Sequence, residues 1–126
     1  MKKKWQLVRT LALVFPLVLS DPFARAGVEI VEIEKVQVVG RLSGVIRDPS
    51  GAPLPDVTVE EVSPDWKAEF QTTKTDGEGH FAMTPKSKGK LYYLVITRSG
   101  FNSMRVRARI NARSTKQLDI KLEFST

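Results

Sequence analysis

The chain has 126 residues, a formal net charge of +6 at pH 7 and no cysteine. The lack of cysteine excludes disulfides, thiolate metal sites and thiol catalysis. Residues 27–78 hold eleven acids and five bases, whereas residues 79–126 hold two acids and ten bases, so residues 27–126 together have a charge of only +2. Such a small charge argues against a nucleic-acid binder.

Residues 1–26 have the pattern of a secretory signal peptide. Three lysines at positions 2–4 form a basic head, residues 11–19 are apolar apart from one proline, and residues 24–26 (Ala-Arg-Ala) suit a signal peptidase. We predict cleavage after Ala26, and therefore a periplasmic or extracellular protein. The apolar run is well short of the roughly 20 residues that span a bilayer, so no transmembrane segment is expected in the mature chain. An uncleaved amphipathic anchor is the alternative. An exported chain without cysteine also favours a bacterial source.

The next segment, residues 27–39 (GVEIVEIEKVQVV), is rich in β-branched residues but alternates imperfectly. It is compatible with an extra edge strand or with an extended arm. From residue 40 onward, the apolar spacing is close to two and turn residues recur regularly, which is typical of an all-β sandwich with little or no helix.

Seven strands are predicted after the arm. The turn-rich connection 48–56 (DPSGAPLPD) separates the first two of them. The nearly continuous apolar run 91–97 (LYYLVIT) fits a central strand. Their number and spacing predict two packed antiparallel sheets. The predicted strands are residues 41–48, 57–62, 69–74, 81–84, 91–97, 103–110 and 116–124.

Four strings together resemble a carboxypeptidase regulatory-like domain: GRLSGVIRDPSGAPLPDVTVEEV (40–62), TDGEGHF (75–81), GKLYYLVITRSGF (89–101) and LDIKL (118–122). The resemblance covers residues 40–124, and we assign 40–126 to the domain. It implies a seven-stranded antiparallel Greek-key β-sandwich of the transthyretin-like, immunoglobulin-like group. The family's order of motifs specifies a fold, not an activity.

The chain lacks the motifs of the enzymes that have related domains. No peptidase domain accompanies the motif, and nothing resembles the zinc-binding histidine and glutamate motif of a metallocarboxypeptidase. The transthyretin-related hydroxyisourate hydrolases have several histidines and a Tyr-Arg-Gly-Ser tail, whereas this chain has one histidine and ends in LEFST. We therefore expect no enzyme, no catalytic residue and no cofactor.

The run KTDGEGHF (74–81) raises the question of a metal site. If it were extended, Asp76, Glu78 and His80 would point to one face and could hold a divalent cation. The glycines at positions 77 and 79 favour a turn instead. We interpret the run as a structural turn, with a weak calcium or zinc site as the alternative.

Candidate binding residues lie on two predicted strands and in two loops. Arg105, Arg107 and Arg109 alternate with apolar residues and should form a row on one sheet face, either binding an acidic partner or pairing with acids such as Glu60 or Glu69. Trp66 could stack on a sugar or a partner, or cap one end of the sandwich.

Tyr92 and Tyr93 are strand neighbours and must face opposite sides, so one should be in the core and the other on the surface. The lysines at positions 86, 88 and 90 surround a glycine-containing loop, where solubility is their expected role and ligand binding the alternative.

The sequence thus predicts a non-catalytic, exported β-sandwich module for protein interaction or structural support in the periplasm or at the cell surface. Its expected partner is a protein or a cell-envelope polymer, not nucleic acid. The alternative is a carbohydrate-binding module that uses exposed aromatics. A metal-dependent hydrolase is a third hypothesis.

Overall fold

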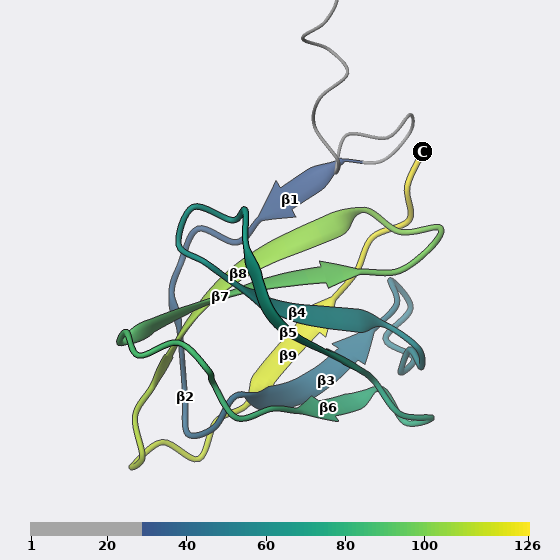
Figure 1. Cartoon of the computed structure of the whole chain (residues 1–126). Coiled ribbons are helices and arrows are strands. Elements are labelled where there is room, and N and C mark those ends of the chain that lie inside the picture. The colour runs from purple at the N-terminus through teal and green to yellow at the C-terminus, as the bar shows by residue number, and fades with distance from the viewer. Residues whose placement is uncertain (1–28) are drawn as a thin grey trace, which may run out of the picture.

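The computed structural model describes residues 29–126, which form nine strands in two layers (Figure 1). One sheet has six strands in the order β1-β8-β7-β4-β5, with β2 also paired to β8, and the other has the order β6-β3-β9. None of the described residues forms a helix that could cross a bilayer. The strands are β1 (Ile30–Glu32), β2 (Gln37–Val39), β3 (Ser43–Arg47), β4 (Thr58–Val62), β5 (Glu69–Lys74), β6 (His80–Ala82), β7 (Leu91–Thr97), β8 (Ser103–Ile110) and β9 (Leu118–Lys121).

The core lies between the two sheets and is built from alternate residues of each strand. Val59 of β4 and Val57, just before that strand, are fully buried, and β7 contributes Leu94 and Ile96 from the same layer. The three-stranded sheet meets them with buried residues such as Ile46. This period of two is what a sheet with one covered face requires.

The seven predicted strands correspond to β3–β9, and the all-β sandwich is confirmed. The strand count was too low, because residues 27–39 contribute two further short strands, β1 and β2. Both pair in parallel with β8, at Ile30↔Ser103 and at Gln37↔Ala108. The arm therefore covers an edge of β8 that would otherwise offer free backbone groups.

The expectation of two purely antiparallel sheets was also wrong. Besides the two arm strands, β3 pairs with β9 in parallel, with Gly44 opposite Leu118 and Ile46 opposite Ile120. Both sheets are consequently mixed. The signal peptide prediction falls on residues 1–26, which lie outside the described residues.

Gly44 of β3 lies where the backbones of β3 and β9 come very close to each other. It is opposite Phe81 of β6 on one side and Leu118 of β9 on the other. A Cβ atom at position 44 would lie 2.2 Å from the Leu118 carbonyl oxygen, which no real contact allows. The absence of a side chain here lets β9 approach β3 closely.

Replacement of Phe81 by alanine tests this core. Phe81 is 5% exposed, so Phe81→Ala should lower the free energy of unfolding by about 3–5 kcal/mol. Phe124 is 61% exposed and stacks on Phe101, so Phe124→Ala should cost only about 1 kcal/mol. Chemical denaturation of both variants measures the difference, and equal losses would place the Phe81 ring outside the core.

Candidate functional site

The turn after β5 is organised by Asp76. Its carboxylate accepts hydrogen bonds from the backbone N–H groups of Glu78, at 2.9 Å, and His80, at 3.0 Å. Gly79 adopts a φ of 77°, which closes the turn. These bonds hold the pKa of Asp76 below its ordinary value, the His80 N–H contributing most. Asp76 is thereby committed to shaping the β5–β6 turn.

Asp76, Glu78 and His80 do not form a metal centre in this geometry. Within residues 29–126, no group of three histidine, aspartate or glutamate side chains is placed to hold a metal ion. The buried hydroxyl of the preceding residue, Thr75, donates to the Leu54 carbonyl and accepts from the Val57 N–H. It ties this turn to the loop before β4, a role that the sequence reasoning missed.

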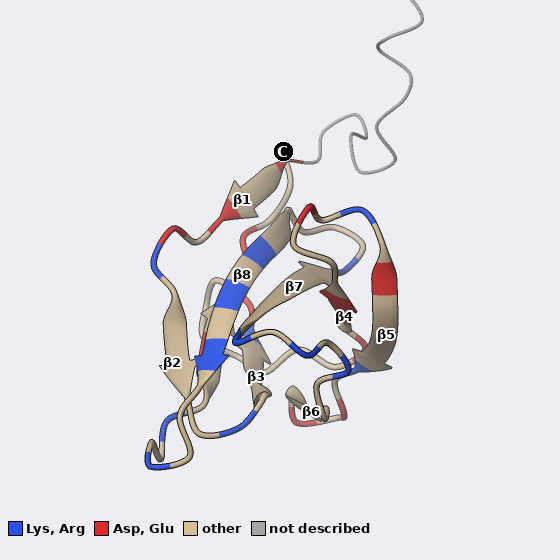
Figure 2. Cartoon of the chain, turned by 60° about the vertical axis from the view of Figure 1, so that its left-hand side comes forward, with Lys and Arg blue, Asp and Glu red and all other residues tan. Residues whose placement is uncertain are grey.

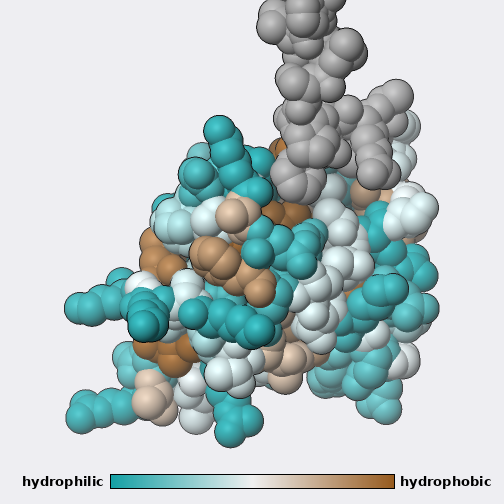
Figure 3. All heavy atoms as spheres, viewed as in Figure 1, coloured by the Kyte–Doolittle hydropathy of each residue, from teal (hydrophilic) through white to brown (hydrophobic). Residues whose placement is uncertain are grey.

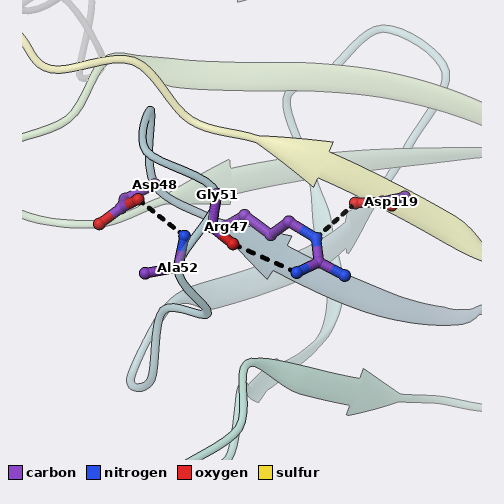
Figure 4. A network of polar contacts seen from close by, with 5 residues as sticks. All are labelled: Arg47, Asp48, Gly51, Ala52 and Asp119. Atoms are coloured by element: carbon purple, nitrogen blue, oxygen red, sulfur yellow. Dashed lines mark hydrogen bonds and ion pairs between the residues drawn. The ribbon is translucent and has the colours of Figure 1, made fainter.

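The connection between β3 and β4 repeats the same device. Asp48 accepts hydrogen bonds from the Ser50 hydroxyl and from the N–H groups of Ser50 and Ala52, and the Ser50 hydroxyl is the main cause of its lowered pKa. Next to it, Arg47 donates to the Gly51 carbonyl and pairs with Asp119 of β9 at 3.1 Å (Figure 4). These polar groups fix one end of the three-stranded sheet.

Glu61 is the most unusual acid of the domain, because its side chain is fully buried. It accepts hydrogen bonds from the N–H groups of Lys86 and Ser87 and from the Gln71 amide. Burial acts to raise the pKa of Glu61, but these hydrogen bonds outweigh it and keep the pKa below its ordinary value. The ionised carboxylate anchors the loop between β6 and β7 to β4.

The outer face of the six-stranded sheet, turned away from the core, carries the arginine row. Arg105, Arg107 and Arg109 of β8 lie at alternate positions on this face, and Figure 2 shows basic residues as separate blue bands along that strand. The expected pairing with Glu60 or Glu69 does not occur, since the ion pair found among residues 29–126 is Arg47–Asp119. Arg107 instead donates to the Glu34 carbonyl of the arm.

The same face holds the aromatic candidates. Trp66 is half-buried and does not cap an end of the sandwich. Its ring meets Tyr93 edge-on at 5.1 Å between centroids, and the Arg105 guanidinium lies over it at 4.9 Å. The position follows from the β4–β5 loop, in which Asp65 accepts from Ser63 and Lys67 and turns the chain back onto the sheet.

The face beneath Trp66 is unusually well covered for a sheet surface with no second layer. Val62 and Val95 point to this side and are only 5% and 2% exposed. Tyr92 faces inward and packs against the core, whereas its neighbour Tyr93 takes the outer position. The sequence predicted this split but could not say which tyrosine was which.

Two glutamates lie at the acidic side of the outer face. Glu60 of β4 is opposite Thr72 of β5, close to Glu69 at the start of that strand. Partial burial, reinforced by the neighbouring Glu69 carboxylate, raises the pKa of Glu60 to about 7, while the pKa of Glu69 is lowered by hydrogen bonds from Thr72 and Glu60. As the pH falls, Glu60 therefore takes up a proton before Glu69 does.

The model of the carboxypeptidase regulatory-like domain matches residues 41–123, and the chain belongs to this family. A search of curated proteins gave no match. Among solved structures, the chain is similar to 3-chlorocatechol 1,2-dioxygenase from Rhodococcus opacus 1CP, with 14% identity and a TM-score of 0.42. That similarity covers 75% of this chain and 64% of the dioxygenase chain.

The raised pKa of Glu60 predicts a pH-dependent stability. The folded state binds the proton more tightly than the unfolded chain, whose pKa is near 4.5, so this contribution is complete below pH 4.5 and is lost as the pH rises through 7. Glu60→Gln should therefore stabilise the domain at pH 8, by on the order of 1 kcal/mol because solvent screens the partly exposed carboxylate.

Thermal melts of Glu60→Gln and of the wild type at pH 5 and pH 8 measure this effect. The increase in stability caused by the substitution should be larger at pH 8 than at pH 5. Glu123→Gln, at an exposed position near the end of β9, serves as the control and should show no such dependence. A gain of the same size at both pH values would contradict the assignment.

Proposed function

We propose that the chain is an exported, non-catalytic module that binds a partner protein in the cell envelope through the outer face of its six-stranded sheet. The observation that carries this proposal is the conformation of Trp66. Its φ is 68°, in the left-handed region that a bulky residue rarely adopts. A strained residue at a loop tip is evidence of a role that compensates the strain.

The chemistry around Trp66 supports a protein partner. Tryptophan, tyrosine and arginine are the residues that dominate binding energy at protein interfaces, and here Trp66 contacts both Tyr93 and Arg105. Their contacts hold the side chains in place before a partner arrives, so little conformational entropy would be lost on binding. The arginine row next to them favours an acidic surface on that partner.

The environment of four acids supports a non-catalytic role. Asp48, Asp65 and Asp76 each accept backbone hydrogen bonds within their own turns, and Glu61 does so for a distant loop. Their lowered pKa values make them poor proton donors near neutral pH. A carbohydrate partner is less favoured, because Arg105 and Tyr93 already occupy a face and an edge of the Trp66 ring.

A photo-cross-linking residue placed on the outer face tests the proposal in intact cells. Thr72 is exposed on β5 and lies opposite Glu60, so a photoreactive phenylalanine there should form a discrete protein adduct. The same residue at Lys121, on the outer side of the other sheet, is the matched control and should not. Charge reversal at the exposed Arg109 should remove most of the adduct.

Two outcomes would contradict the proposal. One is an equal adduct yield from positions 72 and 121, which would indicate random collision. The other is a polysaccharide that quenches Trp66 fluorescence in the absence of any protein adduct, which would assign a sugar ligand instead. Circular dichroism of each variant shows whether its fold is intact, so that a lost adduct reports binding.

Export makes a separate prediction. If the leader is removed after Ala26, the protein recovered from the envelope or the medium should begin at Gly27 and lack 26 residues. Intact-mass spectrometry of the protein purified from an expressing bacterium measures this directly. A full-length mass in the soluble cytoplasmic fraction would contradict export, and a full-length mass in the membrane fraction would indicate an uncleaved anchor.

A further inference from the structure

One end of the sandwich is open, away from the Trp66 cluster. The start of β3, the end of β6 and the last residue of β8 surround a cavity of about 500 Å³. Its apolar walls come from Leu42, Met83 and Ile110, which belong to both sheets. The volume is within the roughly 300–1,000 Å³ typical of small-molecule sites.

The backbone around this cavity is satisfied internally. The Gly40 N–H donates to the Lys116 carbonyl, the Asn111 N–H donates to Val39, and the Met83 N–H donates to Leu42. Gly40 must lack a side chain, because a Cβ there would lie 2.1 Å from the Ser114 carbonyl oxygen. With these backbone groups paired, the side chains of Leu42, Met83 and Ile110 supply the apolar part of the lining.

The rim of the cavity is basic. Arg41 lines the cavity, the β6–β7 loop that follows Pro85 carries three lysines, and residues 111–117, which lie against Gly40, carry Arg113 and Lys116. Residues 40–43, 82–91 and 111–117 contain no acid, and all six basic residues are exposed. None of them forms an ion pair with another of the described residues. In Figure 3, long hydrophilic side chains project on the left and lower left with hydrophobic atoms between them.

We propose that this cavity binds an anionic amphiphile, with the apolar chain between the sheets and a carboxylate or phosphate group at the basic rim. The apolar walls give a reason to take up hydrocarbon, since each buried methylene contributes about 0.8 kcal/mol. The unpaired basic side chains attract an anionic head group, and no acidic residue in these segments repels it. Glu61, under the β6–β7 loop, does not oppose this, because its carboxylate is turned to backbone N–H groups and is buried.

Calorimetric titration of the full mature chain with dodecanoate, below its micellar concentration, tests the site. We expect saturable binding of one dodecanoate per chain. Dodecanol, which keeps the chain but not the charge, and acetate, which keeps the charge but not the chain, should both bind far more weakly. Binding to anionic phosphatidylglycerol vesicles is measured in the same way.

Two variants locate the binding. Arg41→Glu combined with Lys88→Glu reverses charge at the rim, and Ala82→Trp fills the cavity from an exposed position without removing a core side chain. Each should weaken dodecanoate binding by roughly tenfold or more. Lys74→Glu combined with Lys121→Glu makes the same charge change elsewhere on exposed lysines and should leave the affinity nearly unchanged.

Several results would overturn the proposal. These are no binding of dodecanoate, equal affinity for dodecanol, equal weakening by the Lys74 and Lys121 control, or binding that survives both cavity variants. Binding to the vesicles alone, without monomeric dodecanoate, would also overturn it and assign a membrane surface. Melting temperatures near that of the wild type are required of every variant, and Arg113→Glu replaces Ala82→Trp if the latter does not fold.

Discussion

The two sheets can form only if alternate side chains from both meet in one apolar layer. Ile46 from the three-stranded sheet and Leu94 from the six-stranded sheet are fully buried in that layer, and Gly44 lets β9 approach β3 closely within the smaller sheet. Because the side-chain period is two, every residue between these core positions is forced outward. The arginine row and Tyr93 are on the surface for this reason, and the open end exists where the layer stops.

A second constraint follows from the absence of cysteine. With no cross-link, the long connections must be fixed by packing and hydrogen bonds, and carboxylates accepting backbone N–H groups supply much of this. Asp48, Asp65 and Asp76 do so in three turns, and Glu61 does so across the sandwich. These four acids are thus parts of the scaffold. The lysines and arginines have few such duties, so many of them are available for recognition.

The sequence predicted β3–β9 and the core because alternation and turn residues are local signals, and the family motifs span the same region. It left the arm open because β1 and β2 are stabilised by parallel pairing with β8, a partner some 70 residues away. Glu61 could have been noticed, since it shares the inward parity of Val57 and Val59. Trp66 could not have been placed, because its position depends on a positive φ and on ring contacts with residues from two other strands.

The outer face and the open end differ in the physics of recognition. On the outer face, the β4–β5 loop already holds Trp66 against Tyr93 and Arg105 of the sheet, so binding there would depend mainly on shape and on the burial of Trp66 and Tyr93. At the open end, the charges are on flexible side chains in loops, and their attraction for an anion would decrease steeply with ionic strength. Salt concentration therefore separates the two surfaces: a ligand held by the rim is released by added salt, while an aromatic contact on the sheet is retained.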